Sequence, residues 1–115
     1  MKLPEIKMNS QERINILVIG RHPEIMETVL RLIHQQGWRA AGVLTDADAI
    51  DAFKSHTFDL VLMGGGVEEQ SETQLRQQFE RMHPGIKVIR HYGGGSGLLF
   101  AEVREALKIS HNQIN

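Results

Sequence analysis

The stretch Phe58-Asp59-Leu60-Val61-Leu62-Met63 runs directly into Gly64-Gly65-Gly66. Four consecutive apolar residues with a polar entry and a glycine exit predict a strand buried on both faces, in the middle of a parallel sheet. In such sheets, ligands and reacting groups lie just beyond the carboxyl ends of the strands. Position 64 is therefore where chemistry is expected, and it holds a residue without a side chain.

Length and composition exclude several classes of protein. The 115 residues fit one domain, and 13 Lys and Arg against 14 Asp and Glu give no basic footprint for nucleic acid. The chain has no cysteine, which excludes disulfides and thiolate sites. No apolar run is long enough to span a membrane, and residues 1–13 lack the apolar core of a signal peptide. We therefore expect a cytoplasmic protein with no cofactor.

The rest of the chain repeats a strand followed by a helix four times. The expected strands are residues 14–19, 38–44, 58–63 and 86–92. Parallel strands joined by helices need right-handed crossovers, which place helices on both faces of the sheet. This predicts a doubly wound α/β domain at residues 14–109 with strand order 2-1-3-4. Residues 1–13 are expected to be an arm or linker, and residues 110–115 a frayed tail.

Several residues predict where the helices begin and end. Thr45 with Asp48, and Ser71 with Gln74, have the spacing of capping boxes. Gly37 is expected to end the first helix as its C′ residue. The last helix is predicted at residues 98–109, although a less favoured alignment makes residues 98–100 a vestigial fifth strand.

Four stretches resemble the receiver domain of two-component response regulators. They are Ile16-Leu17-Val18-Ile19 with His22-Pro23-Glu24-Ile25, Ala47-Asp48-Ala49-Ile50, Phe58-Asp59-Leu60-Val61-Leu62-Met63, and His83-Pro84-Gly85-Ile86-Lys87-Val88-Ile89. The resemblance covers most of the chain and rests mainly on residues that determine the fold. It implies a three-layer, flavodoxin-like, CheY-like sheet, truncated here before a fifth strand.

The positions that carry chemistry in receivers are different here. Gly20 and Arg21 stand where the family has the acidic pair that holds magnesium, and Gly64 stands at the phosphoryl-acceptor position. Five residues separate Tyr92 from the last helix, which leaves no room for the family's fourth helix and fifth strand. The resemblance thus implies a pseudo-receiver: a non-enzymatic module of a two-component-type system or phosphorelay, with no phosphorylation site and no metal, acting by protein–protein interaction.

A second hypothesis places an anion at the carboxyl edge of the sheet. Glycine-rich turns before helices expose backbone amides that suit phosphate or a nucleotide. The candidate residues follow the first, third and fourth strands: Arg21, His22, Gly64, Gly65, Gly66, His91, Gly93, Gly94, Gly95 and Ser96. The second glycine run, residues 93–97, lacks the Lys-Ser/Thr pair that ends a P-loop. A flexible loop that replaces a deleted helix and strand is the favoured interpretation of residues 93–97.

Other candidate sites are weaker. The six histidines form no metal-binding motif, and Ser96 does not fit a nucleophile elbow, so no catalytic residue is expected. The edge of the fourth strand, or the helices beside it, could pair with a second copy, although Lys87 and Arg90 suit an edge guarded against pairing. A further alternative is a degenerate domain whose fifth strand comes from another chain.

Overall fold

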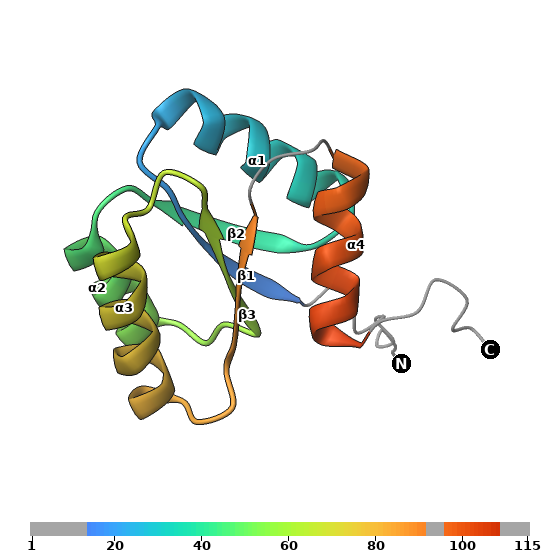
Figure 1. The fold of residues 1–115 in the computed structure, drawn as a ribbon. Helices are drawn as coiled ribbons and strands as arrows, with labels where there is room; N and C mark the ends of the chain where they lie inside the picture. Colours follow the sequence, from blue (N-terminus) through green and yellow to red (C-terminus); the bar gives the residue numbers. More distant parts are fainter. Residues whose placement is uncertain (1–13, 92–95, 109–115) are drawn as a thin grey trace, which may run out of the picture.

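The computed structural model describes residues 14–91 and 96–108, so the predicted arm and tail lie outside the described residues. Strands and helices alternate along this part of the chain (Figure 1). The elements are β1 (Asn15–Ile19), α1 (Pro23–Gln35), β2 (Arg39–Val43), α2 (Asp46–Ser55), β3 (Leu60–Gly64), α3 (Glu69–Met82), β4 (Lys87–His91) and α4 (Ser96–Leu107). The predicted repetition of strand and helix is confirmed.

The sheet is parallel and has the order β2-β1-β3-β4, as the sequence predicted. The register pairs Ile19 with Met63 and Gly64 with His91, so the carboxyl ends of three strands are level. β1 and β3 occupy the centre, which explains why residues 60–63 are almost completely buried. Within the described residues, β2 and β4 form the two edges.

Helices cover both faces of the sheet, with α1 and α4 on one face and α2 and α3 on the other (Figure 1). Side chains alternate along β3 because successive residues of a strand point to opposite faces. Leu60 and Leu62 join the core under α1 and α4, whereas Val61 and Met63 join the core under α2 and α3. The fold is thus a three-layer, doubly wound α/β domain of the flavodoxin-like receiver type.

Local signals in the sequence mark the start of α2 and the end of α1. The Thr45 hydroxyl accepts a hydrogen bond from the amide of Asp48 at 3.1 Å, which confirms the cap of α2. Gly37 follows α1 with φ of +84°, a conformation that favours glycine. The prediction of a cap at Ser71 was wrong, because α3 begins at Glu69 and Ser71 lies in its first turn. The Ser71 side chain hydrogen-bonds the Asp46 carboxylate of α2 instead.

The predicted last helix is confirmed, as α4 from Ser96 to Leu107, and the less favoured alternative is wrong. Residues 98–100 are helical, so they do not form a vestigial fifth strand. Leu99 and Val103 are buried four residues apart, which is the spacing of one helical face. None of the helices in the described part of the chain combines the length and the apolar character needed to span a bilayer.

Candidate functional site

Three strand ends meet at the carboxyl edge of the sheet. Gly20 follows β1, Gly64 ends β3, and His91 ends β4 beside it. A Cβ atom on Gly64 would lie 3.5 Å from the Ile19 carbonyl oxygen, and its next neighbour would be the Cα of Gly20 at 3.8 Å. The sequence correctly predicted that these residues converge. Position 64 has room for a side chain, so the absence of one is not forced by packing.

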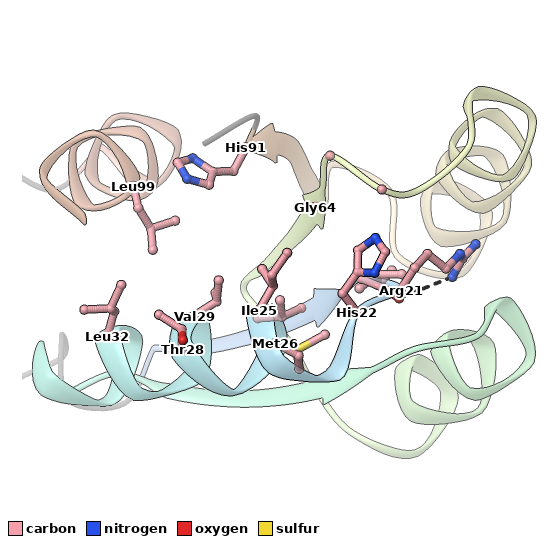
Figure 2. Close-up of a pocket in the computed structure, with 15 residues that line it drawn as sticks. Arg21, His22, Ile25, Met26, Thr28, Val29, Leu32, Gly64, His91 and Leu99 are labelled. Carbon is pink, nitrogen blue, oxygen red and sulfur yellow. Dashed lines mark hydrogen bonds between the residues drawn. The ribbon is translucent and has the colours of Figure 1, made fainter. Parts of the chain in front are cut away.

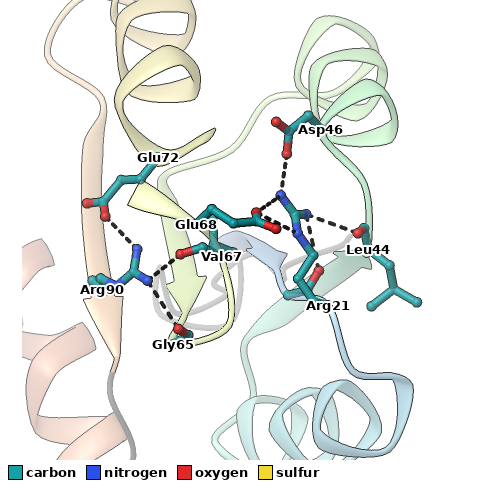
Figure 3. Close-up of polar contacts among 9 residues, drawn as sticks. Arg21, Leu44, Asp46, Gly65, Val67, Glu68, Glu72 and Arg90 are labelled. Carbon is teal, nitrogen blue, oxygen red and sulfur yellow. Dashed lines mark hydrogen bonds and ion pairs between the residues drawn. The ribbon is translucent and has the colours of Figure 1, made fainter. Parts of the chain in front are cut away.

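The positively charged guanidinium of Arg21 occupies the polar part of this edge. Its guanidinium lies 2.6 Å from Asp46 and 3.1 Å from Glu68 (Figure 3). Nη1 also donates to the carbonyl oxygen of Leu44 at 3.0 Å. Arg21 therefore ties the end of β1 to the end of β2, the start of α2 and the start of α3.

The pKa values of these groups move in the direction that strengthens the ion pairs. Burial opposes ionisation of the Asp46 carboxyl, but hydrogen bonds from Ser71 and Arg21, together with the charge of Arg21, hold its pKa below the ordinary 3.8. For Glu68, a backbone hydrogen bond and then Arg21 lower the pKa below 4.5. Burial acts against the charge of Arg21, yet the two carboxylates raise its pKa. At neutral pH all three groups are charged.

A second arginine holds the glycine turn after β3. Arg90, on β4, pairs with Glu72 of α3 and donates to the carbonyl oxygens of Gly65 and Val67 (Figure 3). Burial opposes ionisation of Glu72, but hydrogen bonds and charges from Arg76 and Arg90 lower its pKa below 4.5. The carbonyl oxygens of Gly65 and Val67 thus bind a cation. The anion hypothesis needed backbone amides pointing at the ligand, which is the opposite polarity.

An apolar pocket lies on the other side of the same edge, between α1 and α4. Its volume is about 460 Å³ (Figure 2). The lining residues are Val18, Ile19, Gly20, Arg21, His22, Ile25, Met26, Thr28, Val29, Leu32, Gly64, Gly65, Gly66, His91 and Leu99. The structure therefore brings Arg21, His22, the glycine turn and His91 to one pocket, but its walls are mostly aliphatic.

The two histidines of the pocket stand on opposite sides of it (Figure 2). Nδ1 of His91 lies 2.6 Å from Glu102 of α4, so it donates to that carboxylate. His22 is exposed and packs against the glycine turn, where a Cβ on Gly66 would lie 3.2 Å from its Nε2. Across residues 14–91 and 96–108, no group of three or more His, Cys, Asp or Glu side chains is arranged to hold a metal ion.

Part of the predicted anion site lies outside the described residues. Gly93, Gly94 and Gly95 are not described, and Ser96 is described only as the first residue of α4. The anion site therefore stays a prediction. Neither the pairing of Glu68 with Arg21 nor the pocket between α1 and α4 could be predicted from sequence, because both depend on how helices distant in sequence approach the sheet edge.

Comparison with solved structures shows the class of fold. Similar structures include the signal receiver domain of an HD domain-containing protein from Pseudomonas fluorescens Pf-5, with TM-score 0.73, 13% identity and coverage of 99% of this chain and 98% of that one. A CheY-like receiver domain protein from Methanospirillum hungatei JF-1 has TM-score 0.72 and 14% identity over 83% of this chain and 94% of its own. A complex of histidine kinase ThkA with response regulator TrrA matches with TM-score 0.66 and 19% identity, over 82% and 98%.

These structures define the chain as having the response-regulator receiver fold. No protein-family model matches the sequence, and no curated protein sequence matches it significantly. At identities of 19% or lower, the similarity to these structures shows the fold alone.

Proposed function

We propose that the protein is a pseudo-receiver: a signalling or regulatory module with the receiver fold that takes up no phosphoryl group and acts through protein contacts. One observation carries the proposal. At the edge where a receiver's acidic pair would hold magnesium, the guanidinium of Arg21 is already paired with Asp46 and Glu68.

The chemistry of this edge argues against metal-assisted phosphoryl transfer. Magnesium prefers carboxylate and water oxygens in octahedral geometry. The two carboxylates, Asp46 and Glu68, are both engaged by Arg21, whose guanidinium occupies the place where a cation would have to bind them. Gly64 supplies no nucleophile at the acceptor position. On this account the domain is not an enzyme. It also does not switch between a phosphorylated and an unphosphorylated form, so it presents the same surface to its partners at all times.

Proteins are the proposed partners. The neighbour TrrA forms a complex with a histidine kinase, which supports a partner of the same general kind for this fold. A narrower form of this proposal is a homodimer, in which the partner is a second copy that binds through the edge of β4 or the helices beside it. Arg76 donates to the Val88 carbonyl oxygen at 3.0 Å and so occupies one backbone acceptor of β4. This contact favours the helices over the strand edge, and light scattering at high protein concentration tests the dimer.

The phosphate or nucleotide hypothesis has less support. Its best cation, Arg21, is engaged by two carboxylates, and the third carboxylate nearby, Glu102, faces His91. Negative charge at the edge raises the cost of binding another anion. A thermal-shift screen with nucleotides and inorganic phosphate tests it, because a ligand at 100 times its Kd adds about 2.7 kcal/mol of stability.

The pseudo-receiver proposal is tested with magnesium and beryllofluoride, which mimic a phosphorylated aspartate. Amide NMR spectra of the wild-type protein should not change when both are added. The matched variant carries Gly20→Asp, Arg21→Asp and Gly64→Asp, and restores the missing carboxylates. Saturable shifts in the wild type around position 64 would refute the proposal, whatever the variant does.

A further inference from the structure

The helices α1 and α4 lie on the same face of the sheet and are joined at one end. Nη2 of Arg104 on α4 donates to Oε1 of Gln36, just after α1, at 2.7 Å. The Trp38 ring, in the segment after α1, meets Phe100 edge to face, with centroids 6.3 Å apart. The Arg104 guanidinium lies 5.8 Å from the centroid of Trp38. These contacts fix the spacing of the helices toward the amino-terminal edge of the sheet.

At the carboxyl edge, the part of the chain that the structure describes leaves an open pocket between the same two helices. Its floor is closed by Val18 and Ile19 of β1, each at most 3% exposed. Gly20 and Gly64 contribute no side chains that would fill it. Figure 2 shows the aliphatic side chains of α1 on one wall and Leu99 of α4 opposite. The pocket therefore follows from two glycines at strand ends and from the gap between two helices.

Ile25 marks the mouth of this pocket. It belongs to the apolar side of α1 in the sequence, yet 61% of its surface is exposed. Its side chain lines the pocket and is not packed into either core. Removing apolar area from water stabilises by about 25 cal/mol per Å². A ligand that covered Ile25 and the inner wall would therefore gain binding energy from surface that the fold leaves exposed.

Charge at the rim selects against an anionic ligand. Arg21 is matched by Asp46 and Glu68, and His91 is held by Glu102. With Nδ1 engaged, Nε2 is the ring nitrogen of His91 left to bond a ligand. A neutral hydroxyl or carbonyl suits this arrangement, whereas a carboxylate or phosphate would meet a guanidinium already paired with Asp46 and Glu68 and a histidine already paired with Glu102.

We propose that the pocket between α1 and α4 binds a neutral small molecule with an apolar, ring-sized body and one hydrogen-bonding head. The volume of about 460 Å³ lies within the range of small-molecule sites, about 300 to 1,000 Å³. The apolar body lies between Val29 and Leu99, and the head lies at His91. This site is independent of the pseudo-receiver proposal, because it uses no phosphoryl chemistry and no metal.

The test compares two probes with the same ring system, 1-naphthol and 1-naphthoate. The neutral naphthol should bind saturably, with a Kd below the millimolar range, and should shift the amide signals of Val29 and Leu99 in NMR spectra. The anionic naphthoate should bind at least tenfold more weakly, which corresponds to about 1.4 kcal/mol. Equal or tighter binding of naphthoate would overturn the preference for neutral ligands.

Two blocking variants and a control complete the test. Gly64→Leu places a side chain in the pocket, and Val29→Phe narrows it from the α1 wall. Each should reduce naphthol affinity at least tenfold. Gln78→Leu adds the same side chain on the exposed surface of α3 and should leave affinity unchanged. Shifts in the wild type that map away from the pocket, or full affinity in a folded blocking variant, would refute the proposal.

Discussion

Replacing Arg21 with alanine should destabilise the domain by about 2 kcal/mol. The change removes the ion pair with Asp46 and leaves the Leu44 carbonyl without that donor. Hydrogen bonds to charged groups contribute about 1.5–3 kcal/mol. Because the Asp46 side chain is 38% exposed, solvent screening reduces its share to about 1 kcal/mol. The Leu44 carbonyl accounts for about 1 kcal/mol more.

Urea unfolding followed by circular dichroism measures this loss. The unfolding midpoint should fall with the slope unchanged. The melting temperature should fall by about 8 °C, at about 4 °C per kcal/mol for a domain of this size. The difference between wild type and variant should shrink in about 1 M salt, because partly exposed ion pairs are screened.

The matched control is Arg31→Ala. Arg31 is exposed on α1 and makes no hydrogen bond or ion pair within the described part of the chain. Its replacement should change the free energy of unfolding by less than about 0.5 kcal/mol. If Arg21→Ala lowered the free energy of unfolding by no more than this control does, the ion pair and hydrogen bond of Arg21 would not stabilise the domain as we propose.

Three further predictions concern the same fold. The lowered pKa of Asp46 gives stability that is fully present above its ordinary pKa of 3.8 and is lost as the pH falls through its lowered pKa in the folded protein, so the gap between wild type and Arg21→Ala should narrow only below the ordinary pKa in urea titrations. Gly42→Ala should cost about 1–3 kcal/mol, because the new Cβ would lie 2.5 Å from the sulfur of Met26; no loss of melting temperature would contradict that contact. Phe79→Ala should cost about 3–5 kcal/mol in calorimetry, because Phe79 is fully buried; a loss under about 1 kcal/mol would be inconsistent with this core.

The architecture could be predicted from sequence because local signals agreed with one another. The buried run at residues 60–63 fixed the central strand, and Thr45 and Gly37 marked helix ends by local backbone chemistry. The cap at Ser71 failed because α3 begins earlier, at Glu69, and the Ser71 side chain hydrogen-bonds the Asp46 carboxylate instead. A capping motif is a short-range signal, and here the Ser71 side chain found a tertiary partner.

The site was only partly predictable. Convergence of Gly20, Gly64 and His91 follows from parallel topology, which places all carboxyl ends on one edge. The partners of Arg21 do not follow, since Asp46 at the start of α2 and Glu68 just before α3 are 25 and 47 residues from it in sequence. From its position in the sequence, Arg21 was a candidate to bind an anion. In the folded domain its guanidinium is paired with two carboxylates instead.

The central claim is that this receiver fold takes up no phosphoryl group. Intact-mass spectrometry after incubation with acetyl phosphate and magnesium tests it most directly. We predict an unchanged mass for the wild-type protein, because Gly64 has no side chain to accept a phosphoryl group and Arg21 already pairs with the Asp46 carboxylate. A phosphoryl increment that required magnesium and was labile in hydroxylamine, as an aspartyl phosphate is, would contradict the account.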